Sequence, residues 1–136
     1  MSQENVEIVR RVYDAAARRD AATVLDLYDP EVELDLSRLQ VVGFMGQDVY
    51  RGHQGLRTFF REWHEAWENI EYDYDELIDA GEEVISVATR RGRGRVSGAE
   101  VELAVALVWT IREGRVVRVA WFRSRAEALE AAGLQE

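Results

Sequence analysis

The spacing of apolar residues changes along the chain, from intervals of three and four to strict alternation. Residues 3–18 and 53–69 place apolar side chains three and four positions apart, which predicts two amphipathic helices. A shorter helix is expected over residues 21–28, capped by Asp20 and ended by Pro30. The chain is therefore predicted to begin with helices.

Alternating apolar and polar residues predict strands in most of the rest. A first strand is expected over residues 32–36, followed by the irregular, glycine-containing stretch 37–52. The strands expected after the long helix cover residues 70–79, 83–91, 99–111 and 115–122. A short helix over residues 124–133, capped by Gly133, closes the chain. Helices followed by a meander of antiparallel strands indicate one α+β domain over residues 1–136, with helices packed on one sheet face.

The strand 99–111 has two unlike faces. Large apolar side chains share the face expected to meet the helices: Val101, Leu103, Val105, Leu107 and Trp109. The opposite face is centred on Ala104 and Ala106, which make it neither a typical core nor a typical polar surface. Flat, lightly apolar sheet faces are often halves of dimer interfaces, so we expect a homodimer through this face. A lightly apolar face exposed to solvent is the alternative.

Composition narrows the function. The chain has no cysteine, and its two histidines, His53 and His64, lie too far apart for metal-ligand spacing, so no metal cofactor is expected. The formal charge of -9 argues against nucleic-acid binding. All 17 basic residues are arginines, a bias typical of GC-rich bacterial genes. We find neither a signal peptide nor a run of roughly 18 apolar residues, so no membrane contact and a cytoplasmic location are expected.

Several stretches in order resemble one family. The succession DPEVEL, YRGHQGLRTFFREW, ELIDAGEEVI, VWTIREGRVVRV and RAEALEAAGL is similar to the SnoaL-like branch of the nuclear-transport-factor-2-like superfamily. The resemblance covers nearly the whole chain. It implies a cystatin-like cone, in which a strongly curved antiparallel sheet wraps around helices and often opens into an apolar pocket. Polyketide cyclases, ketosteroid isomerases, limonene-epoxide hydrolases, dehydratases and non-catalytic proteins share this fold, so the fold alone does not name the function.

The isomerase pattern of the family is not met. The resemblance places its carboxylate base at Leu36, its tyrosine near Val12 and its second acid near Leu107. A one-residue shift in register would bring Asp35 and Tyr13 to the first two positions, but no acid is available for the third.

The hydrolase and cyclase patterns are not met either. The acid of the hydrolase relay would fall near Trp121, and Val87, Ala88 and Thr89 stand where its arginine and second aspartate are expected. The cyclase acid near the end of the last strand has no counterpart in residues 115–124. Apolar or aromatic residues thus replace each expected acid.

The remaining candidates for catalysis are His64, Asp35 and Tyr13. His64 lies between Trp63 and Trp67 on the helix over residues 53–69 and can point into the cone as an acid–base group. It can equally flank the apolar stripe with its ring bonded to a backbone carbonyl. Asp35 lies on the strand face opposite Leu34, and a solvent-exposed carboxylate is the alternative there.

A dense basic stretch, RRGRGR over residues 90–95, is expected at the tip of a hairpin. Such a tip can bind a phosphate or a carboxylate, or it can simply keep a turn in solvent.

The aromatic residues predict a pocket. If the long helix packs on the concave sheet, its tryptophans meet those of the last two strands. The expected pocket lining is Val12, Tyr13, Leu34, Leu36, Phe60, Trp63, Trp67, Leu107, Trp109 and Trp121. A cavity of this kind suits a small apolar, cyclic molecule. The sequence does not decide whether the protein also catalyses an isomerisation, cyclisation or hydration of that molecule. The alternative is a non-catalytic dimerisation or interaction module whose cone is filled by its own side chains.

Overall fold

The computed structural model describes residues 2–39, 47–71 and 73–134, so the irregular stretch expected over 37–52 lies partly outside the described residues. The helices are α1 (Ser2–Ala17), α2 (Ala21–Leu27), α3 (Gly52–Ala66) and α4 (Arg125–Ala131). The strands are β1 (Tyr28–Asp35), β2 (Val49–Arg51), β3 (Trp67–Glu68), β4 (Glu76–Ala80), β5 (Glu83–Gly94), β6 (Glu100–Arg112) and β7 (Arg115–Phe122).

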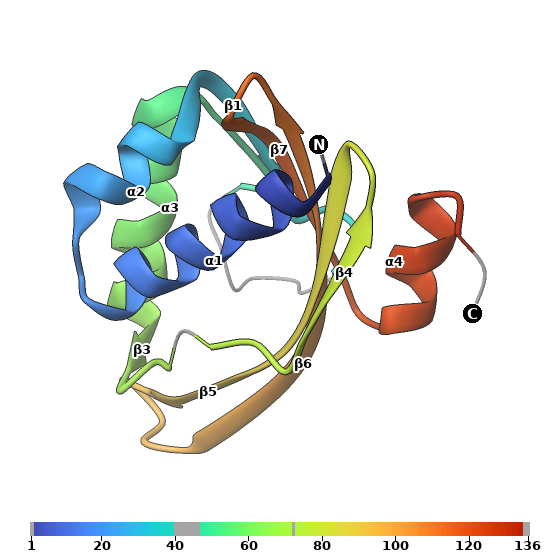
Figure 1. Ribbon diagram of the computed structural model, residues 1–136. Coiled ribbons are helices and arrows are strands. Elements are labelled where there is room, and N and C mark those ends of the chain that lie inside the picture. Colours follow the sequence, from blue (N-terminus) through green and yellow to red (C-terminus); the bar gives the residue numbers. More distant parts are fainter. Residues whose placement is uncertain (1, 40–46, 72, 135–136) are drawn as a thin grey trace.

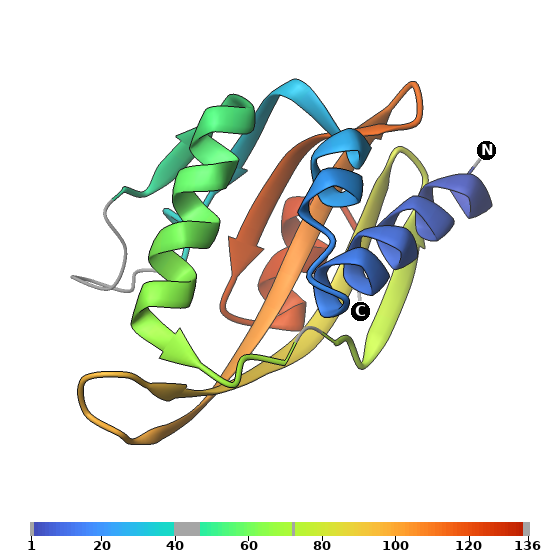
Figure 2. The same ribbon diagram turned by 90° about the vertical axis from the view of Figure 1, so that its left-hand side faces the viewer.

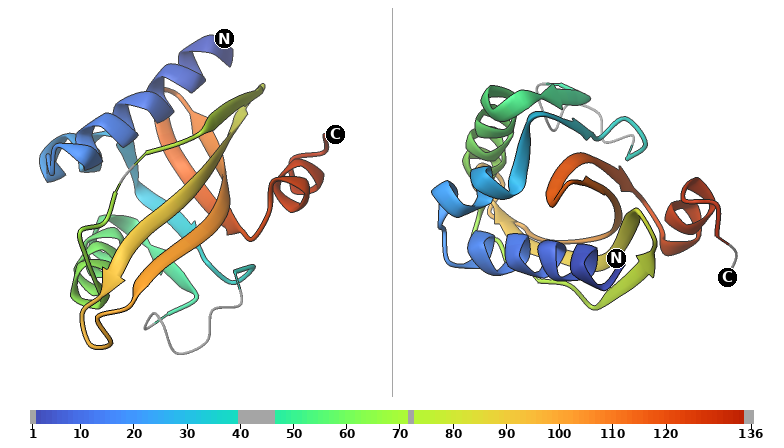
Figure 3. Two further views of the ribbon diagram at one scale, coloured as in Figure 1. Left: turned by 90° about the horizontal axis from the view of Figure 1, so that it is seen from below. Right: turned by 45° about the horizontal axis from the view of Figure 1, so that its top comes forward.

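The strands form one curled sheet. Its order is β2-β1-β7-β6-β5-β3, and β4 also pairs with β5. Strand β1 runs parallel to β7, whereas the other described pairings are antiparallel. The sheet curls around α1, α2 and α3, which lie on its concave side (Figure 1). Figure 2 faces that side, with α3 and the α1–α2 pair in front of the sheet, and Figure 3 shows the curl. The α+β cone predicted from the sequence is confirmed.

Local signals explain several element ends. The Asp20 carboxylate accepts hydrogen bonds from the backbone N–H and hydroxyl of Thr23, which caps α2 as predicted. The turn between β6 and β7 has positive φ at Glu113 (51°) and Gly114 (78°), as a two-residue hairpin of the primed type requires. Gly133, at φ 78°, follows α4 as its predicted cap.

Strand alternation separates two apolar layers. On the concave side, Val105, Leu107 and Trp109 pack with the three N-terminal helices, as the pattern of this strand predicts. On the convex side, Ala106 and Val108 belong to a second apolar cluster with residues of α4. The short C-terminal helix therefore packs on the outside of the cone.

That position of α4 changes the interpretation of the alanine-rich face. Ala106 is fully buried, in one cluster with Ala128 and Leu129 of α4, whereas Ala104 is exposed. The face predicted to form a dimer interface is thus partly covered by the chain itself.

Several elements differ from the sequence prediction, among them β2, which lies in the stretch 37–52 expected to be irregular. Strand β1 begins at Tyr28 and includes Pro30, at an irregularity of its pairing with β7 where a residue without an N–H is tolerated. Trp67, expected in the long helix, is extended and pairs with Gly94 in β3–β5. The strand expected from residue 70 begins only at Glu76. Strand β5 continues to Gly94 and takes up most of the expected basic hairpin tip.

Two absences concern the described part of the chain alone. None of its helices has both the length and the apolar character needed to cross a bilayer. In residues 2–39, 47–71 and 73–134, no three side chains of the metal-ligating types come together as a metal site.

The packing of α4 gives a first prediction. Leu129 is 4 % exposed, so Leu129→Ala should lower the free energy of unfolding by about 2–4 kcal/mol. The exposed neighbour Glu130 is the control, and Glu130→Ala should stay within about 0.5 kcal/mol of the parent chain. Urea unfolding followed by circular dichroism measures both, and equal values for the two variants would contradict the packing of α4 on the sheet.

Candidate functional site

The interior of the cone holds a small space, which we call the inner chamber. Its volume is about 40 Å³, and α1, α3 and strands β1, β5, β6 and β7 all contribute to its wall. The predicted lining residues that do line it are Val12, Tyr13, Leu34, Phe60, Trp63, Leu107, Trp109 and Trp121. Leu36 and Trp67 are absent from this wall, and Trp67 lines a smaller recess beside it.

Aromatic rings fill most of the cone. Trp63 packs edge-on against Trp121 with ring centroids 5.6 Å apart, and Phe59 stacks on Trp63 at 5.6 Å. The remaining 40 Å³ has room for a few water molecules, each of which needs about 10–15 Å³, but not for an aromatic ring. The tryptophans of α3 and the last two strands converge as predicted, and in doing so they leave little space.

A polar cluster lies behind this wall, where Ser86 bonds to two of the lining residues, Tyr13 and Trp109. The fully buried Ser86 hydroxyl lies 2.8 Å from the Tyr13 hydroxyl and accepts the Trp109 indole N–H, also at 2.8 Å. These bonds satisfy three groups that would be costly to bury alone. Ser86 was missed by the sequence analysis, although it stands on the inward side of β5 between Val84 and Ala88.

Arg90 is an unexpected member of the chamber wall. It was predicted in an exposed hairpin tip, but β5 runs on past it, and alternation from Ser86 turns its side chain inward. Its side chain is 7 % exposed. The guanidinium donates to the Asp73 carbonyl at 3.1 Å and to the Tyr13 hydroxyl at 3.4 Å. It also lies over the rings of Tyr13 and Trp121, 5.4 and 5.6 Å from their centroids.

The chamber presents donors without a matching anion. Within the described part of the chain, no carboxylate forms an ion pair with Arg90, and no aspartate or glutamate lines the chamber. The buried Trp121 indole N–H has no hydrogen-bond partner among the described residues. Arg90 and Trp121 therefore offer N–H groups suited to an acceptor oxygen.

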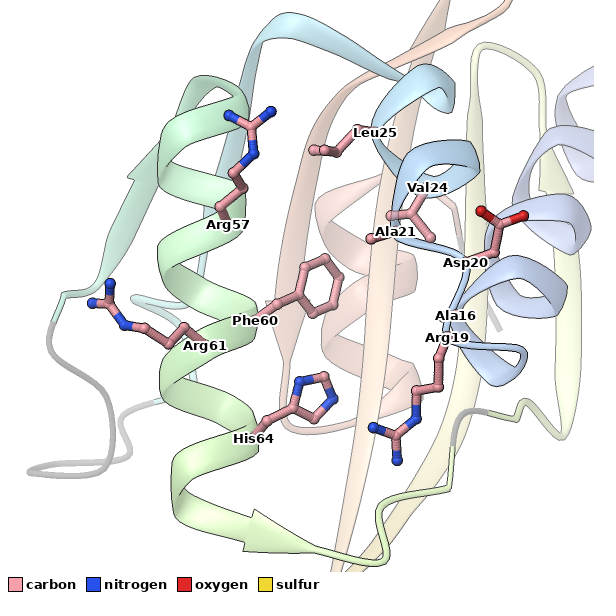
Figure 4. Close-up of a pocket in the computed structure, with 10 residues that line it drawn as sticks. All are labelled: Ala16, Arg19, Asp20, Ala21, Val24, Leu25, Arg57, Phe60, Arg61 and His64. Carbon is pink, nitrogen blue, oxygen red and sulfur yellow. The ribbon is translucent and has the colours of Figure 1, made fainter.

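A wider groove adjoins the chamber, and we call it the outer groove. It lies between α3 and the α1–α2 corner and has a volume of about 380 Å³. The residues that line it are Ala16, Arg19, Asp20, Ala21, Val24, Leu25, Arg57, Phe60, Arg61 and His64 (Figure 4). Ala16 and Phe60 also line the inner chamber, so these two residues form the shared wall.

Two arginines, Arg57 and Arg19, stand at the ends of the apolar floor of the outer groove. Figure 4 shows the Phe60 and His64 rings pointing from α3 toward α2, with Arg57 and Arg19 toward the two ends. The carboxylate of Asp20 is occupied by its cap on Thr23. An apolar floor with a cationic rim suits an apolar molecule that carries negative charge.

The three catalytic candidates do not form one site. Tyr13 lies in the inner chamber, His64 lines the outer groove, and Asp35 is on the other face of β1. The Asp35 carboxylate accepts hydrogen bonds from the Ser37 side chain and backbone and pairs with Arg118 at 2.8 Å. Partial burial alone would raise the pKa of Asp35, but the Ser37 bonds and the Arg118 charge hold it below the usual value. Asp35 is thus an outward, ion-paired carboxylate.

His64 occupies a positive environment. Its ring stacks on Phe60 with centroids 6.3 Å apart. Burial lowers the pKa of His64, and the charges of Arg19 and Arg95 lower it further. A histidine that is neutral near pH 7 at the edge of an apolar groove can accept or donate a hydrogen bond there.

The titration of His64 gives a second prediction. Its pKa in the folded protein should lie below the usual histidine value of 6.5, so the unfolded chain binds the proton more readily. The resulting stability is fully present above pH 6.5 and is lost as the pH falls through the folded pKa. The His64 ring signals in proton NMR, assigned with His53→Gln, measure the midpoint.

Arg19→Gln should raise that midpoint, because it removes one of the two positive charges that lower it. Arg18→Gln, which changes a neighbouring arginine paired with Asp14, is the matched control. A midpoint at or above 6.5 in the parent chain would contradict the placement of His64.

Comparisons with known proteins place the chain in a family. A family model described as a SnoaL-like domain matches residues 9–119. An NTF2-like protein from Burkholderia thailandensis is 30% identical, with 91% of this chain and 95% of that chain covered at a TM-score of 0.76. A search of curated proteins finds no match.

Two more distant structures share the fold. TerC, co-crystallised with polyporic acid, is 21% identical, with 96% of this chain and 98% of that chain covered at a TM-score of 0.76. A proposed polyketide cyclase from Xanthomonas campestris is 16% identical, with 96% and 98% covered at a TM-score of 0.72. At these identities the likeness concerns the fold.

Proposed function

Because this chain belongs to the SnoaL-like domain family, whose fold serves many functions, we propose a function from its own cavities: it binds a small apolar, cyclic molecule. The outer groove and the inner chamber together form the proposed site. The observation that carries the proposal is that Phe60 and Ala16 line both spaces. The Phe60 side chain thus divides a single larger pocket into two.

The outer groove has the size and the chemistry for such a ligand. Its volume of about 380 Å³ falls within the roughly 300–1,000 Å³ of small-molecule sites. Ala21, Val24 and Leu25 from α2 and Phe60 from α3 supply apolar surface. A flat ring is favoured there because it can stack on Phe60 and cover these side chains.

Movement of Phe60 would join the two spaces. Its side chain is only partly buried, unlike that of its neighbour Phe59, which is 3 % exposed. A rotamer change of this ring, which packs against Phe59 and His64, would make the 40 Å³ of the inner chamber accessible without a change of fold.

The proposal assigns binding and no reaction. Tyr13 and Arg90 are placed to hold an oxygen atom, but a proton transfer also needs a base, and no carboxylate lines the inner chamber in the described residues. The second candidate function, an interaction module with a filled cone, is favoured by the small volume of that chamber. Ligand binding separates the two.

The outer groove can be blocked selectively. Ala21 and Ala22 are adjacent, exposed residues of α2, but Ala21 lines the groove and Ala22 does not. The neutral probe N-phenyl-1-naphthylamine should bind the parent chain with saturable energy transfer from tryptophan. Ala21→Phe should weaken binding at least tenfold, a loss of about 1.4 kcal/mol, whereas Ala22→Phe should not change it.

A failure of the probe to bind the parent chain would favour the interaction module. Equal weakening by Ala21→Phe and Ala22→Phe would show that the probe binds elsewhere. Both results are read from the same fluorescence titration, and circular dichroism confirms that the variants are folded.

We also propose that two copies associate through the part of the convex face that α4 leaves uncovered. Ala104 is exposed there, and the half-buried Thr89 is its partner across β5 and β6. The cross-strand pair Arg91–Glu102, at 3.6 Å, flanks this patch and can exchange partners across a two-fold axis.

Light scattering after gel filtration tests the association. The parent chain should have twice the 15.6 kDa mass of one chain, and Ala104→Arg should reduce it to a single chain. Glu130→Arg, on the exposed side of α4, is the control and should remain a dimer. A parent chain that elutes with the mass of one chain at roughly 100 μM would contradict the proposal.

A further inference from the structure

We infer that the inner chamber is a carboxylate-binding site anchored by Arg90, so that the ligand is an apolar organic acid. The inference rests on the proposed function and names the chemical class of its ligand. In the bound state the carboxylate lies in the inner chamber and the apolar body lies in the outer groove, on either side of Phe60.

The unpaired charge of Arg90 is the first argument. A guanidinium stays protonated in proteins, and burying an ion without a counter-ion is unfavourable. Arg90 is 7 % exposed, and its contacts in the described structure are the Asp73 carbonyl, the Tyr13 hydroxyl and two aromatic rings, all of them neutral. A ligand carboxylate would supply the missing charge.

The donor geometry is the second argument. A guanidinium carries five N–H groups, and the two hydrogen bonds of Arg90 leave others available. The Trp121 indole N–H, which has no partner among the described residues, lines the same chamber. A carboxylate has two oxygens that accept several hydrogen bonds, so it can use both side chains at once.

The size of the chamber is the third argument. Its volume of about 40 Å³ excludes a ring but accommodates a group that replaces one or two waters. A carboxylate is such a group. The outer groove, with about 380 Å³, has the room for the rest of the molecule.

The charge of the entrance is the fourth argument. The chain as a whole carries -9, which repels anions at long range. Around the outer groove, however, two arginines, Arg19 and Arg57, outnumber the one carboxylate, Asp20. An anion therefore approaches Arg90 through a locally positive opening.

The experiment compares two probes that differ only in charge. Titration calorimetry at pH 7 measures 2-naphthoate and 2-naphthamide, which have the same ring and nearly the same size. The parent chain should bind naphthoate roughly 10-fold to 100-fold more tightly, the gain expected of a charge-assisted hydrogen bond.

Arg90→Met should abolish this preference while keeping the binding of naphthamide, and Arg90→Lys should keep part of it. Arg91→Met is the matched control: it removes one arginine from the adjacent position of β5, on the outer face, and should retain the preference. If Arg90→Met does not fold, Arg90→Gln replaces it, because its amide can still donate to the Asp73 carbonyl.

Thermal melting without ligand separates anchoring from a structural role. If Arg90 serves the ligand, Arg90→Met should melt at the same temperature as the parent chain or higher, since an apolar group replaces a buried unpaired ion. A lower melting temperature in Arg90→Met and Arg90→Gln, with the naphthoate preference intact, would assign Arg90 to holding the Asp73 segment and overturn the inference.

Other outcomes overturn it as clearly. Equal affinity of the parent chain for the two naphthyl probes, or no binding of either, would exclude a carboxylate anchor. The proposed function would then stand or fall separately on N-phenyl-1-naphthylamine and the Ala21→Phe variant. Loss of the naphthoate preference in Arg91→Met as well would show that general charge, and not Arg90, produces it.

Discussion

The register between β5 and β6 is the constraint on which the rest of the structure depends. The two strands pair without interruption from Glu83 opposite Thr110 to Arg93 opposite Glu100. Because strand side chains alternate, this ladder turns Ser86 and Arg90 to the same side as the aromatic core. A slip of one residue would turn both side chains to the convex face and point Val87 and Arg91 toward the aromatic core instead. The polar features of the inner chamber follow from this one ladder.

The same ladder explains why the interior of the cone is crowded and still contains a buried charge without a counter-ion. Ser86 bonds to Tyr13 of α1 and Trp109 of β6, so one hydroxyl fixes a helix and a strand relative to each other. Arg90, four residues further, is held by neutral groups and by the faces of two rings. The interior thus combines a fully satisfied polar cluster with a charge that no carboxylate of the described residues neutralises, and binding sites differ from ordinary cores in this respect.

Periodicity predicted the helices of the first half and the long strands, because a strong pattern over ten or more residues outweighs local exceptions. The cone was implied by the family resemblance. The sequence also indicated most of the chamber wall, since the apolar sides of α3, β6 and β7 must face each other. It misjudged Arg90, since RRGRGR has the composition of a turn and the end of β5 is set by its pairing partner. The place of α4 was also not foreseen, because a short amphipathic helix fits either face of a sheet.

The parallel pairing of β1 with β7 has a consequence for how the chain reaches this state. Glu33 and Arg118 are bonded across these strands although they are 85 positions apart in sequence. Such distant contacts are slow to form, because a long loop must close before they contribute. On the ribosome, β1 has no neighbour on this edge until Arg118, 85 positions after Glu33, has emerged. Until then one edge of β1 stays unpaired, and unpaired strand edges are the segments through which incomplete chains aggregate.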